Sequence, residues 1–396
     1  MNPLVQAEQA VLGAVFLEPG QLNRLSSWLR PHHFHRPVHA ATYAAMLKLR
    51  ADGHPATETR AGEPVPLAWV TDAVAEASTR TRGLTASYAH SLVSACPRPE
   101  HAVVYGRMVL EGAIHRSVAQ HATRLHQAAR ADAIRGGAEE TIHHAEVLYE
   151  VLADLARRWG TEPRAEAPPA SVTPPTAAYP QPVEEHLLAD EELLLGGLSA
   201  RPQQLRAVVG WLRPDDFADV GHQQIYRSLG ALHHRGEPID QMTVLWETQR
   251  RGALADRTLD VERVRRICGP SAFAGAAEHL GEQVVQASLV RTAAASARKV
   301  RALADDESLA PGGLINYALH ALGPLDEVRH RWRIGTDAEP GLSRTASHPP
   351  APPPAARIDA ARSRSRSHRP VAAQPAVSTT APRPSAQDRP HRRSLA

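Results

Sequence analysis

Hydrophobic positions recur with a helical period along much of the chain. From Ala7 to Leu17 the apolar residues fall three and four positions apart, which places them on one face of an α-helix. Pro19 suits the first turn of a second helix that runs to about Trp28, because the fixed φ of proline matches a helix start. The same period predicts a third helix from Pro37 to Arg50, which Gly53 ends. The N-terminal part of the chain is therefore expected to be a helical bundle.

Two pairs of long helices are predicted farther along. The expected ranges are Ala102 to Arg130 with Ala133 to Arg158, broken near Asp132, and Ala274 to Leu303 with Pro311 to Trp332. Two long antiparallel helices joined by a short turn form a helical hairpin. Such a hairpin exposes a broad apolar stripe, which usually seeks a partner. That partner is either the other hairpin of the chain or a separate chain, and the pattern does not choose between them.

The composition agrees with a helical protein. Hydrophobic residues make up 42% of the chain but aromatic residues only 4%, so the core must consist mainly of Leu, Val and Ala. Leu and Ala favour helices, whereas the aromatic residues that favour strands are scarce. We therefore expect the all-α fold class.

A repeat divides the chain in two. Glu8 to Pro55 aligns with Glu191 to Pro238 at a constant offset of 183 residues, and sixteen of the 48 positions are identical. The run Trp-Leu-Arg-Pro that begins at Trp28 recurs at Trp211. Tryptophan and proline are rare residues, and similarity at a fixed offset is typical of a duplicated unit. The sequence therefore predicts two tandem helical-bundle modules, each ending in a long hairpin.

The repeat sets the expected domain boundaries. We assign residues 1–158 to the first module and 185–335 to the second. Residues 159–184 hold seven prolines and are expected to be an extended linker. Residues 336–396 are rich in Pro, Ala, Ser and Arg, a composition that buries too little apolar surface to fold, and are expected to be a disordered tail. Farther along the modules Arg116 and Arg291 are 175 residues apart, so the first module has extra residues, expected near 58–66.

The tail carries most of the positive charge. From Ser343 onward there are ten arginines against two acids, a net charge of +8, which leaves −5 for the rest of a chain whose net charge is +3. Arginines interleaved with serines suit non-specific phosphate contacts, although aromatic residues for base stacking are missing. The alternative is a solvated tail without a partner. The candidate nucleic-acid-binding residues are Arg362, Arg364, Arg366, Arg369, Arg392 and Arg393.

Histidines are the first candidates for chemistry. His32, His33 and His35 resemble part of a metal site, but the second module has no corresponding ligands, so we interpret them as solvated loop residues. His39 and His222 occur in both modules at the start of a helix. A catalytic base is conceivable there, but no accompanying nucleophile or carboxylate was recognised, which favours capping or a hydrogen bond in the core. No catalytic residue, metal or cofactor is expected.

Cysteine and tryptophan residues are also interpreted as structural. Cys96 and Cys268 lie at similar places near a helix end, and nothing around them predicts a lowered thiol pKa, so both are expected to be small buried side chains. Trp28 and Trp211 are expected to anchor the core rather than to stack on bases. Two cysteines form no disulfide framework, and no signal peptide or membrane-spanning run is recognised, which favours a cytoplasmic location.

The ordered motifs resemble a known family. Glu-x-x-x-Leu-Gly, Leu-x-Pro-x-x-Phe, His-x-x-Ile-Tyr and Gly-x-Pro-Ile-Asp occur in that order between Glu191 and Asp240, and the first module keeps most of them from Glu8 to Pro55. They are similar to the N-terminal domain of DnaB-type replicative helicases, over roughly 7–155 and 187–332. The resemblance implies a helical bundle with a hairpin. It also implies that such domains pair through their hairpins into a collar that docks primase or a helicase loader.

One departure from the family concerns ATP hydrolysis. Helicases of this family continue into a RecA-like domain, whose Gly-x-x-x-x-Gly-Lys-Ser/Thr loop holds the triphosphate. The chain has two lysines, Lys48 and Lys299, and neither follows a glycine loop. We therefore expect a protein that is not an enzyme.

Three functions follow from these observations. The first is a protein-interaction module of DNA replication that binds a replicative helicase, a primase or a helicase loader. The second is a nucleic-acid-binding adaptor that acts through the basic tail. The third is part of a helicase whose ATPase is a separate chain.

Overall fold

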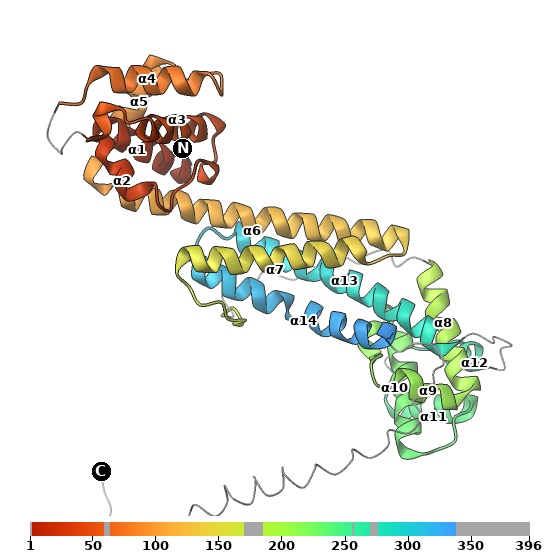
Figure 1. The fold of residues 1–396 in the computed structure, drawn as a ribbon. Helices are drawn as coiled ribbons and strands as arrows, with labels where there is room; N and C mark the ends of the chain where they lie inside the picture. The colour runs from red at the N-terminus through yellow and green to blue at the C-terminus, as the bar shows by residue number, and fades with distance from the viewer. Residues whose placement is uncertain (1, 59–63, 170–184, 256, 270–275, 338–396) are drawn as a thin grey trace, which may run out of the picture. The chain divides into compact units, whose positions relative to one another are not determined.

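A computed structural model describes residues 2–58, 64–169, 185–255, 257–269 and 276–337. Within these ranges the regular structure consists of fourteen α-helices and six short 3₁₀-helices (Figure 1). This confirms the predicted all-α class. By their contacts, residues Met1–Ala338 form one compact unit.

Each module has a small helical bundle, called here the head. Head 1 comprises five α-helices, namely α1 (Pro3–Leu17), α2 (Leu22–Leu25), α3 (Pro37–Ala51), α4 (Leu67–Ser78) and α5 (Ala86–Ser94). Head 2 also comprises five, namely α8 (Glu185–Ala200), α9 (Leu205–Val208), α10 (Val220–Arg235), α11 (Gln241–Arg250) and α12 (Val261–Cys268). The six 3₁₀-helices are η1 (Pro19–Gln21), η2 (Pro31–His33), η3 (Pro55–Glu58), η4 (Pro99–His101), η5 (Pro202–Gln204) and η6 (Pro214–Asp216).

A long hairpin follows each head. Hairpin 1 consists of α6 (Ala102–Arg135) and α7 (Glu139–Trp159), and hairpin 2 of α13 (Ala277–Asp305) and α14 (Pro311–Asp337). Within each hairpin the two helices pack on each other. The two predicted hairpins are therefore present.

Two boundaries differ from the prediction. The second helix spans only Leu22 to Leu25. Residues from Pro19 to Gln21 form a 3₁₀-helix instead of its first turn, and the chain forms a turn between Leu25 and Trp28. Hairpin 1 does not break at Asp132, which lies inside α6, but at Gly136, whose φ of 78° suits glycine. The buried Asp132 side chain instead accepts hydrogen bonds from Thr141, at 2.8 Å from both the backbone N and Oγ1. It therefore stabilises the first turn of α7.

The two hairpins share one hydrophobic core. Apolar residues of α6 and α7, from Leu110 to Ala156, belong to the same buried cluster as those of hairpin 2 and head 2, whereas head 1 has a core of its own. Helix α6 packs along α13, and α7 contacts α14 (Figure 1). The apolar stripe of each hairpin is thus covered by the other hairpin of the same chain.

The first part of the predicted linker is packed rather than free. The backbone N of Arg164 donates to Oδ1 of Asn316 at 3.0 Å, and that of Glu166 donates to the Asn316 carbonyl at 3.3 Å. Residues 161–169 have no regular secondary structure. Because they lie against α14, the linker is anchored at its beginning.

Candidate protein-interaction site

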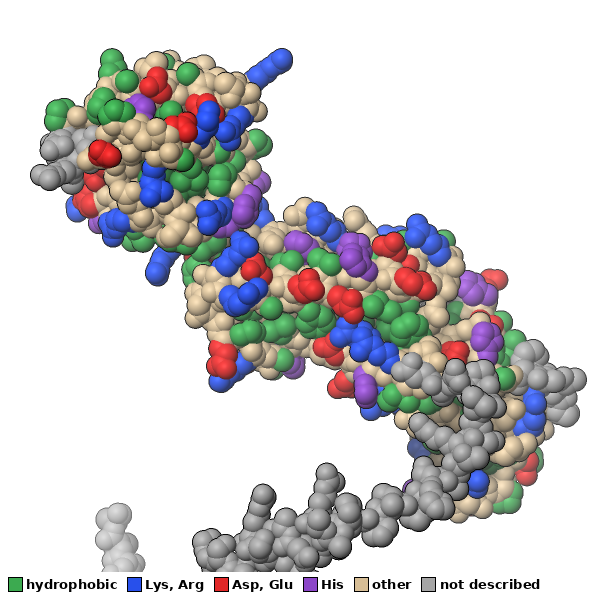
Figure 2. Space-filling model, viewed as in Figure 1, with side chains coloured by type: hydrophobic (Ala, Val, Ile, Leu, Met, Phe, Trp, Pro, Cys, Tyr) green, Lys and Arg blue, Asp and Glu red, His purple; other side chains and the backbone are tan. Residues whose placement is uncertain are grey.

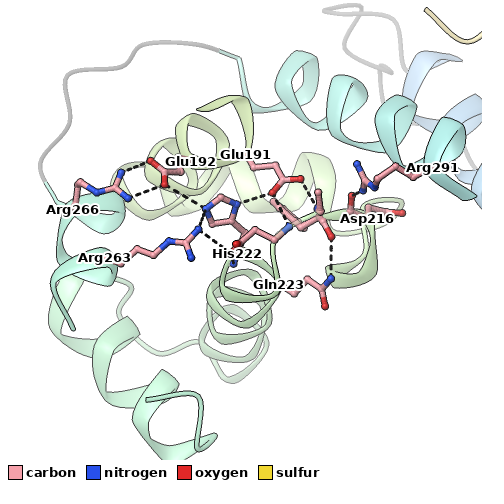
Figure 3. A network of polar contacts seen from close by, with 11 residues as sticks. Glu191, Glu192, Asp216, His222, Gln223, Arg263, Arg266 and Arg291 are labelled. Carbon is pink, nitrogen blue, oxygen red and sulfur yellow. Dashed lines mark hydrogen bonds and ion pairs between the residues drawn. The ribbon is translucent and has the colours of Figure 1, made fainter. Parts of the chain in front are cut away.

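The motif residues of module 2 meet in a buried polar network in head 2 (Figure 3). Glu191 of α8 has no exposed surface and binds Nδ1 of the equally buried His222 at 2.7 Å. Its carboxylate also accepts the backbone N–H of Ala218, at 2.6 Å. Glu191 therefore caps the segment that leads into α10, and the charge of the carboxylate is offset by several donors.

The other face of the His222 ring is occupied as well (Figure 3). Nη2 of Arg263 lies 2.9 Å from Nε2 of His222, and the same guanidinium nitrogen lies 2.9 Å from Oδ1 of Asp219. The same ring nitrogen also lies 3.5 Å from Oε1 of Glu192, so Nε2 of His222 is placed between a guanidinium and a carboxylate.

Head 1 repeats the carboxylate–histidine pair with a different third residue. Glu8 binds Nδ1 of His39 at 2.7 Å, and both side chains are fully buried. Nε2 of His39 lies 2.7 Å from the hydroxyl of Tyr88 in α5. The backbone N–H groups of His35 and Arg36 donate to Glu8, as Ala218 and Asp219 do to Glu191.

These pairs resemble a general base and its orienting carboxylate, but their setting is structural. Neither His39 nor His222 has exposed surface, and Nε2 of each ring is already engaged. A general base needs a substrate proton within hydrogen-bond reach. The interpretation of both histidines as core hydrogen-bonding residues is confirmed.

A second recurring contact joins each head to its hairpin. Arg116 of α6 donates to the carbonyl of His33, and Arg291 of α13 donates to the carbonyl of Asp216. His33 is the last residue of η2 and Asp216 the last residue of η6, so the two carbonyls are equivalent. The arginines that bind them are 175 residues apart, which is therefore the offset between α6 and α13. Burial lowers the pKa of both arginines, partly offset by Glu8 or by Glu191 and Asp216.

The side chains at these two places differ. Buried Asp216 accepts from Oγ of Ser288 at 2.8 Å and from the guanidinium of Arg331, so it binds both helices of hairpin 2. His33 occupies the equivalent place and accepts only the backbone N–H of Arg30, at 3.1 Å. Burial, reinforced by nearby His32 and Arg158, lowers the pKa of His33 to about 4.

The three loop histidines differ in their exposure. Of the three loop histidines, His32 and His35 are exposed as expected, but His33 is buried, which corrects its interpretation as a solvated residue. Among the described residues no group of three His, Cys, Asp or Glu side chains is placed to hold a metal ion.

Both predicted tryptophan anchors contact their hairpins. Trp28 donates from Nε1 to the carbonyl of Arg24 and Trp211 to that of Ala207, both at 2.8 Å. A Cβ on Gly106 would lie 2.8 Å from Trp28, and one on Gly281 would lie 2.7 Å from Trp211. Each glycine therefore admits the indole ring. Trp211 is buried and Trp28 half-buried, which confirms core anchoring.

The cysteines are free and not activated. Cys268 is buried, and burial raises its pKa to about 11. Cys96 is only half-buried, which corrects the expectation of a buried side chain, and desolvation raises its pKa too. Neither thiol has the lowered pKa of a reactive cysteine.

Comparison with known proteins matches both modules to one family. The DnaB-like helicase N-terminal domain matches residues 1–111 and 183–268. The replicative DNA helicase DnaB of Geobacillus stearothermophilus is 37% identical over 123 residues, which are 31% of this chain and 25% of that protein. The replicative DNA helicase DnaC of Bacillus subtilis is 34% identical over the same length and shares. For DnaB of Mycobacterium leprae the identity is 32% over 152 residues, 37% of this chain and 23% of the relative.

Both modules resemble the DnaB-like helicase N-terminal domain. The chain spans about a quarter of the length of these helicases, and the match covers their N-terminal domain rather than their ATPase domain. This domain links the chain to replicative helicases and DNA replication. No solved structure matched the chain.

The two DnaB-like modules differ on one surface. In module 1, Val104 and Met108 of α6 are 52% and 47% exposed. Met108 lines two open grooves of about 930 Å³ and 810 Å³, which also share Pro3 and Ala7 as lining residues. At the offset of 175 the equivalent residues of α13 are His279 and Gln283, which are polar. Only module 1 thus offers this apolar pair.

The remaining predicted site residues lie elsewhere. All six candidate arginines of the tail, Arg362 to Arg393, lie outside the described residues. Over the hairpins, the face seen in Figure 2 shows Lys and Arg side chains interspersed with Asp and Glu. No helix in the described ranges is long and apolar enough to cross a membrane. Lys48 lies in α3 and Lys299 in α13, both within regular helix.

Glu8 and Glu191 are not identified by the sequence analysis as the partners of the two histidines. Each glutamate begins the repeated motif and lies 31 residues before the histidine of its module. A carboxylate that recurs at a fixed distance from a recurring histidine was the available signal.

Proposed function

We propose that the chain is a non-enzymatic interaction protein of DNA replication, which contacts a replicative helicase, a primase or a helicase loader. The observation that carries the proposal is that the hairpins of the two DnaB-like modules cover each other's apolar stripe within one chain. The chain then presents two heads on a ready-made pair of hairpins. A separate second subunit is not needed to form that pair.

We place the binding site for the partner at the apolar pair of module 1, Val104 and Met108. Val104 and Met108 are exposed on α6, and the two grooves that Met108 lines give room for side chains. Exposed apolar patches rimmed by polar residues are typical of protein interfaces. An apolar segment of the helicase, primase or loader would bind here.

The test is co-elution of the purified full chain with the purified replicative helicase, primase and loader of the same cell. The variant V104H/M108Q gives module 1 the residues of module 2 and should weaken binding at least tenfold, since two apolar side chains are lost. Leu67→Gln is a matched control, because Leu67 is 83% exposed and lies outside the linings of both grooves.

Three results would contradict this proposal. One is that none of the three proteins binds the chain. Another is that V104H/M108Q binds as well as the L67Q control. The third is ATP hydrolysis by the pure chain, which would favour an enzyme.

A second candidate function is a nucleic-acid adaptor, supported by the net charge of +8 from residue 343 onward. Deletion of residues 343–396 should then abolish binding to DNA, and binding by the full chain should weaken steeply with salt. If binding survives the deletion, the folded modules carry it. A third candidate is cooperation with an ATPase on a separate chain, which reconstitution with candidate ATPases tests. The fold and function proposed here fit a cytoplasmic protein.

A further inference from the structure

Polar contacts across the seam between the two hairpins are one-sided. The seam is the surface where α6 meets α13 and α7 meets α14. A pair of identical hairpins related by a twofold axis would make every such contact twice. Here the contacts join unlike residues: Nε2 of Gln286 in α13 donates to the carbonyl of Gly136 in the turn of hairpin 1 at 2.9 Å, whereas a histidine of α6 contacts the turn of hairpin 2.

Charges at the α7–α14 contact are divided between the hairpins. Glu146 of α7 pairs with Arg329 of α14 at 3.5 Å and with Arg333 at 4.0 Å. The guanidinium of Arg329 also lies 5.9 Å from the ring centre of Tyr149. In this contact hairpin 1 supplies the acid and hairpin 2 the cations.

Tyr149 adds a directional contact. Its hydroxyl lies 2.6 Å from Oδ2 of Asp326 and 3.1 Å from the carbonyl of Leu322. Burial, with the help of Asp326, raises the pKa of Tyr149, so the hydroxyl keeps its proton and donates. The phenol belongs to hairpin 1 and the carboxylate to hairpin 2.

His115 makes the most buried contact of the seam. This residue is 8% exposed, and its two ring nitrogens lie 3.0 Å from the carbonyls of Ala304 in the last turn of α13 and of Leu309 in the turn of hairpin 2. These carbonyls lie near the end of α13, where the helix supplies no N–H donor. Nearby, Nη1 of Arg301 donates to Oγ1 of Thr123 at 2.8 Å.

The equivalent residues of the other hairpin do not repeat these groups. The offset of 175 applies to α6 and α13, and an offset of 173 aligns Trp159 at the end of α7 with Trp332 in α14. Each seam residue then corresponds to a residue of different chemistry. The pairs are Glu146 with Leu319, Tyr149 with Leu322, Ala153 with Asp326, Ala156 with Arg329, Gly160 with Arg333, His115 with Val290, and His126 with Arg301.

We propose that the seam specifies pairing of hairpin 1 with hairpin 2 and disfavours pairing of like hairpins. Two copies of hairpin 1 would place Glu146 against Ala156 and Gly160, without a cation. Two copies of hairpin 2 would place Val290 against the carbonyls of Ala304 and Leu309, which would lose their contact with the polar ring of His115. Unlike pairing gives each of these groups a polar partner, and unmatched polar groups against the wrong partner are a known source of specificity.

The consequence is that each hairpin takes the other hairpin of the chain, not the same hairpin of a second copy, as its partner. The linker holds both hairpins at high effective concentration, which favours the pairing within one chain. This inference deepens the ready-made pair in the proposed function, but it holds whether or not the chain binds a replication protein.

The experiment uses the full chain with a protease site inserted between residues 170 and 184. After folding and cleavage, the two halves are exchanged with halves from an isotope-labelled preparation, and native mass spectrometry identifies the pairs. Only pairs of one N-terminal with one C-terminal half are expected. Like pairs in comparable amounts, or halves that separate into monomers, would overturn the proposal.

Variants test the individual contacts in the same experiment. His115→Val should lower the ratio of unlike to like pairs at least about tenfold, because two buried carbonyls lose their polar partner. Glu146→Arg should lower it about fivefold, and E146R combined with R329E should recover part of the loss, because Arg329 also pairs with Asp326 of its own helix at 3.1 Å. Glu150→Arg, an exposed charge reversal one turn farther along α7, should change nothing. Failure of the double variant to recover, or an H115V ratio equal to that of the parent, would refute the assignment.

Discussion

Head 1 and head 2 solve the same folding problem with partly different residues. In both heads, a buried glutamate accepts hydrogen bonds from two backbone N–H groups. It also binds a histidine in the first turn of α3 or α10. The outer nitrogen of that histidine meets Tyr88 in head 1 but Arg263 in head 2. The comparison shows that the carboxylate–histidine pair is the constant element, while the residue behind it is free to change.

The joints between head and hairpin differ more. Asp216 binds both helices of hairpin 2, whereas the His33 side chain accepts the backbone N–H of Arg30 and only the His33 carbonyl contacts hairpin 1, through Arg116. Trp211 is likewise enclosed by Gly281 and Gly335, while Trp28 is half-buried beside Gly106. Head 2 therefore makes more buried polar contacts with its hairpin than head 1 does, and the predictions below test that difference.

The largest effect is expected where the modules agree. Glu8→Ala and Glu191→Ala should each destabilise the protein by about 3–5 kcal/mol, because a buried polar partner and two backbone donors are left unsatisfied. Urea denaturation measures the change in the free energy of unfolding. The exposed acid Glu150 is the control, since E150A should have almost no effect. A large loss in one module alone would show that the pair is not a common element.

The next effect separates the joints. Asp216→Ala should cost about 3 kcal/mol, because Arg331 keeps a buried charge without its carboxylate. His33→Ala should cost only about 1 kcal/mol, since one hydrogen bond and modest packing are lost. The same denaturation experiment compares the two variants. Equal losses would mean that the joints are equally strong despite their different contacts.

A pH effect is expected from head 1. Folding lowers the pKa of His33 from 6.5 to about 4, so between these values the unfolded chain binds more protons than the folded protein. Stability contributed by neutral His33 is therefore lost as the pH falls from 6.5 towards 4, by about 2 kcal/mol at pH 5. His33→Asn should flatten this part of the stability curve. An unchanged slope in H33N would show that another group is responsible.

The smallest difference between the two modules is expected at the tryptophan contacts. Gly281→Ala should cost about 2–3 kcal/mol, since the added Cβ meets the enclosed ring of Trp211. Gly106→Ala should cost about 1 kcal/mol, because the half-buried Trp28 has room to shift. Thermal unfolding of both variants gives the order. The reverse order would contradict the tighter enclosure of Trp211.

Much of the fold follows from local patterns. The long hairpins, the helix from Pro37 and its end at Gly53 agree with the sequence, because period, proline and glycine act over a few residues. The short α2 and the continuous α6 do not agree, since a 3₁₀ turn and the Asp132–Thr141 contact depend on neighbours in space. The burial of His33 does not follow from the sequence for the same reason, because it results from packing on the hairpin.

The sequence by itself determined that the chain is helical, that its two modules resemble one domain, and which motif letters recur. It placed Glu8 and His39, and Glu191 and His222, at one fixed spacing, but not in contact. Only the tertiary structure decided that these residues bind each other, and that the stripe of each hairpin is covered by the other hairpin of the same chain. The physical reason is that an apolar stripe is stabilised by any apolar surface that covers it. His115, Glu146 and Tyr149 favour one particular partner helix, and they do so only when that helix brings their polar partners within reach.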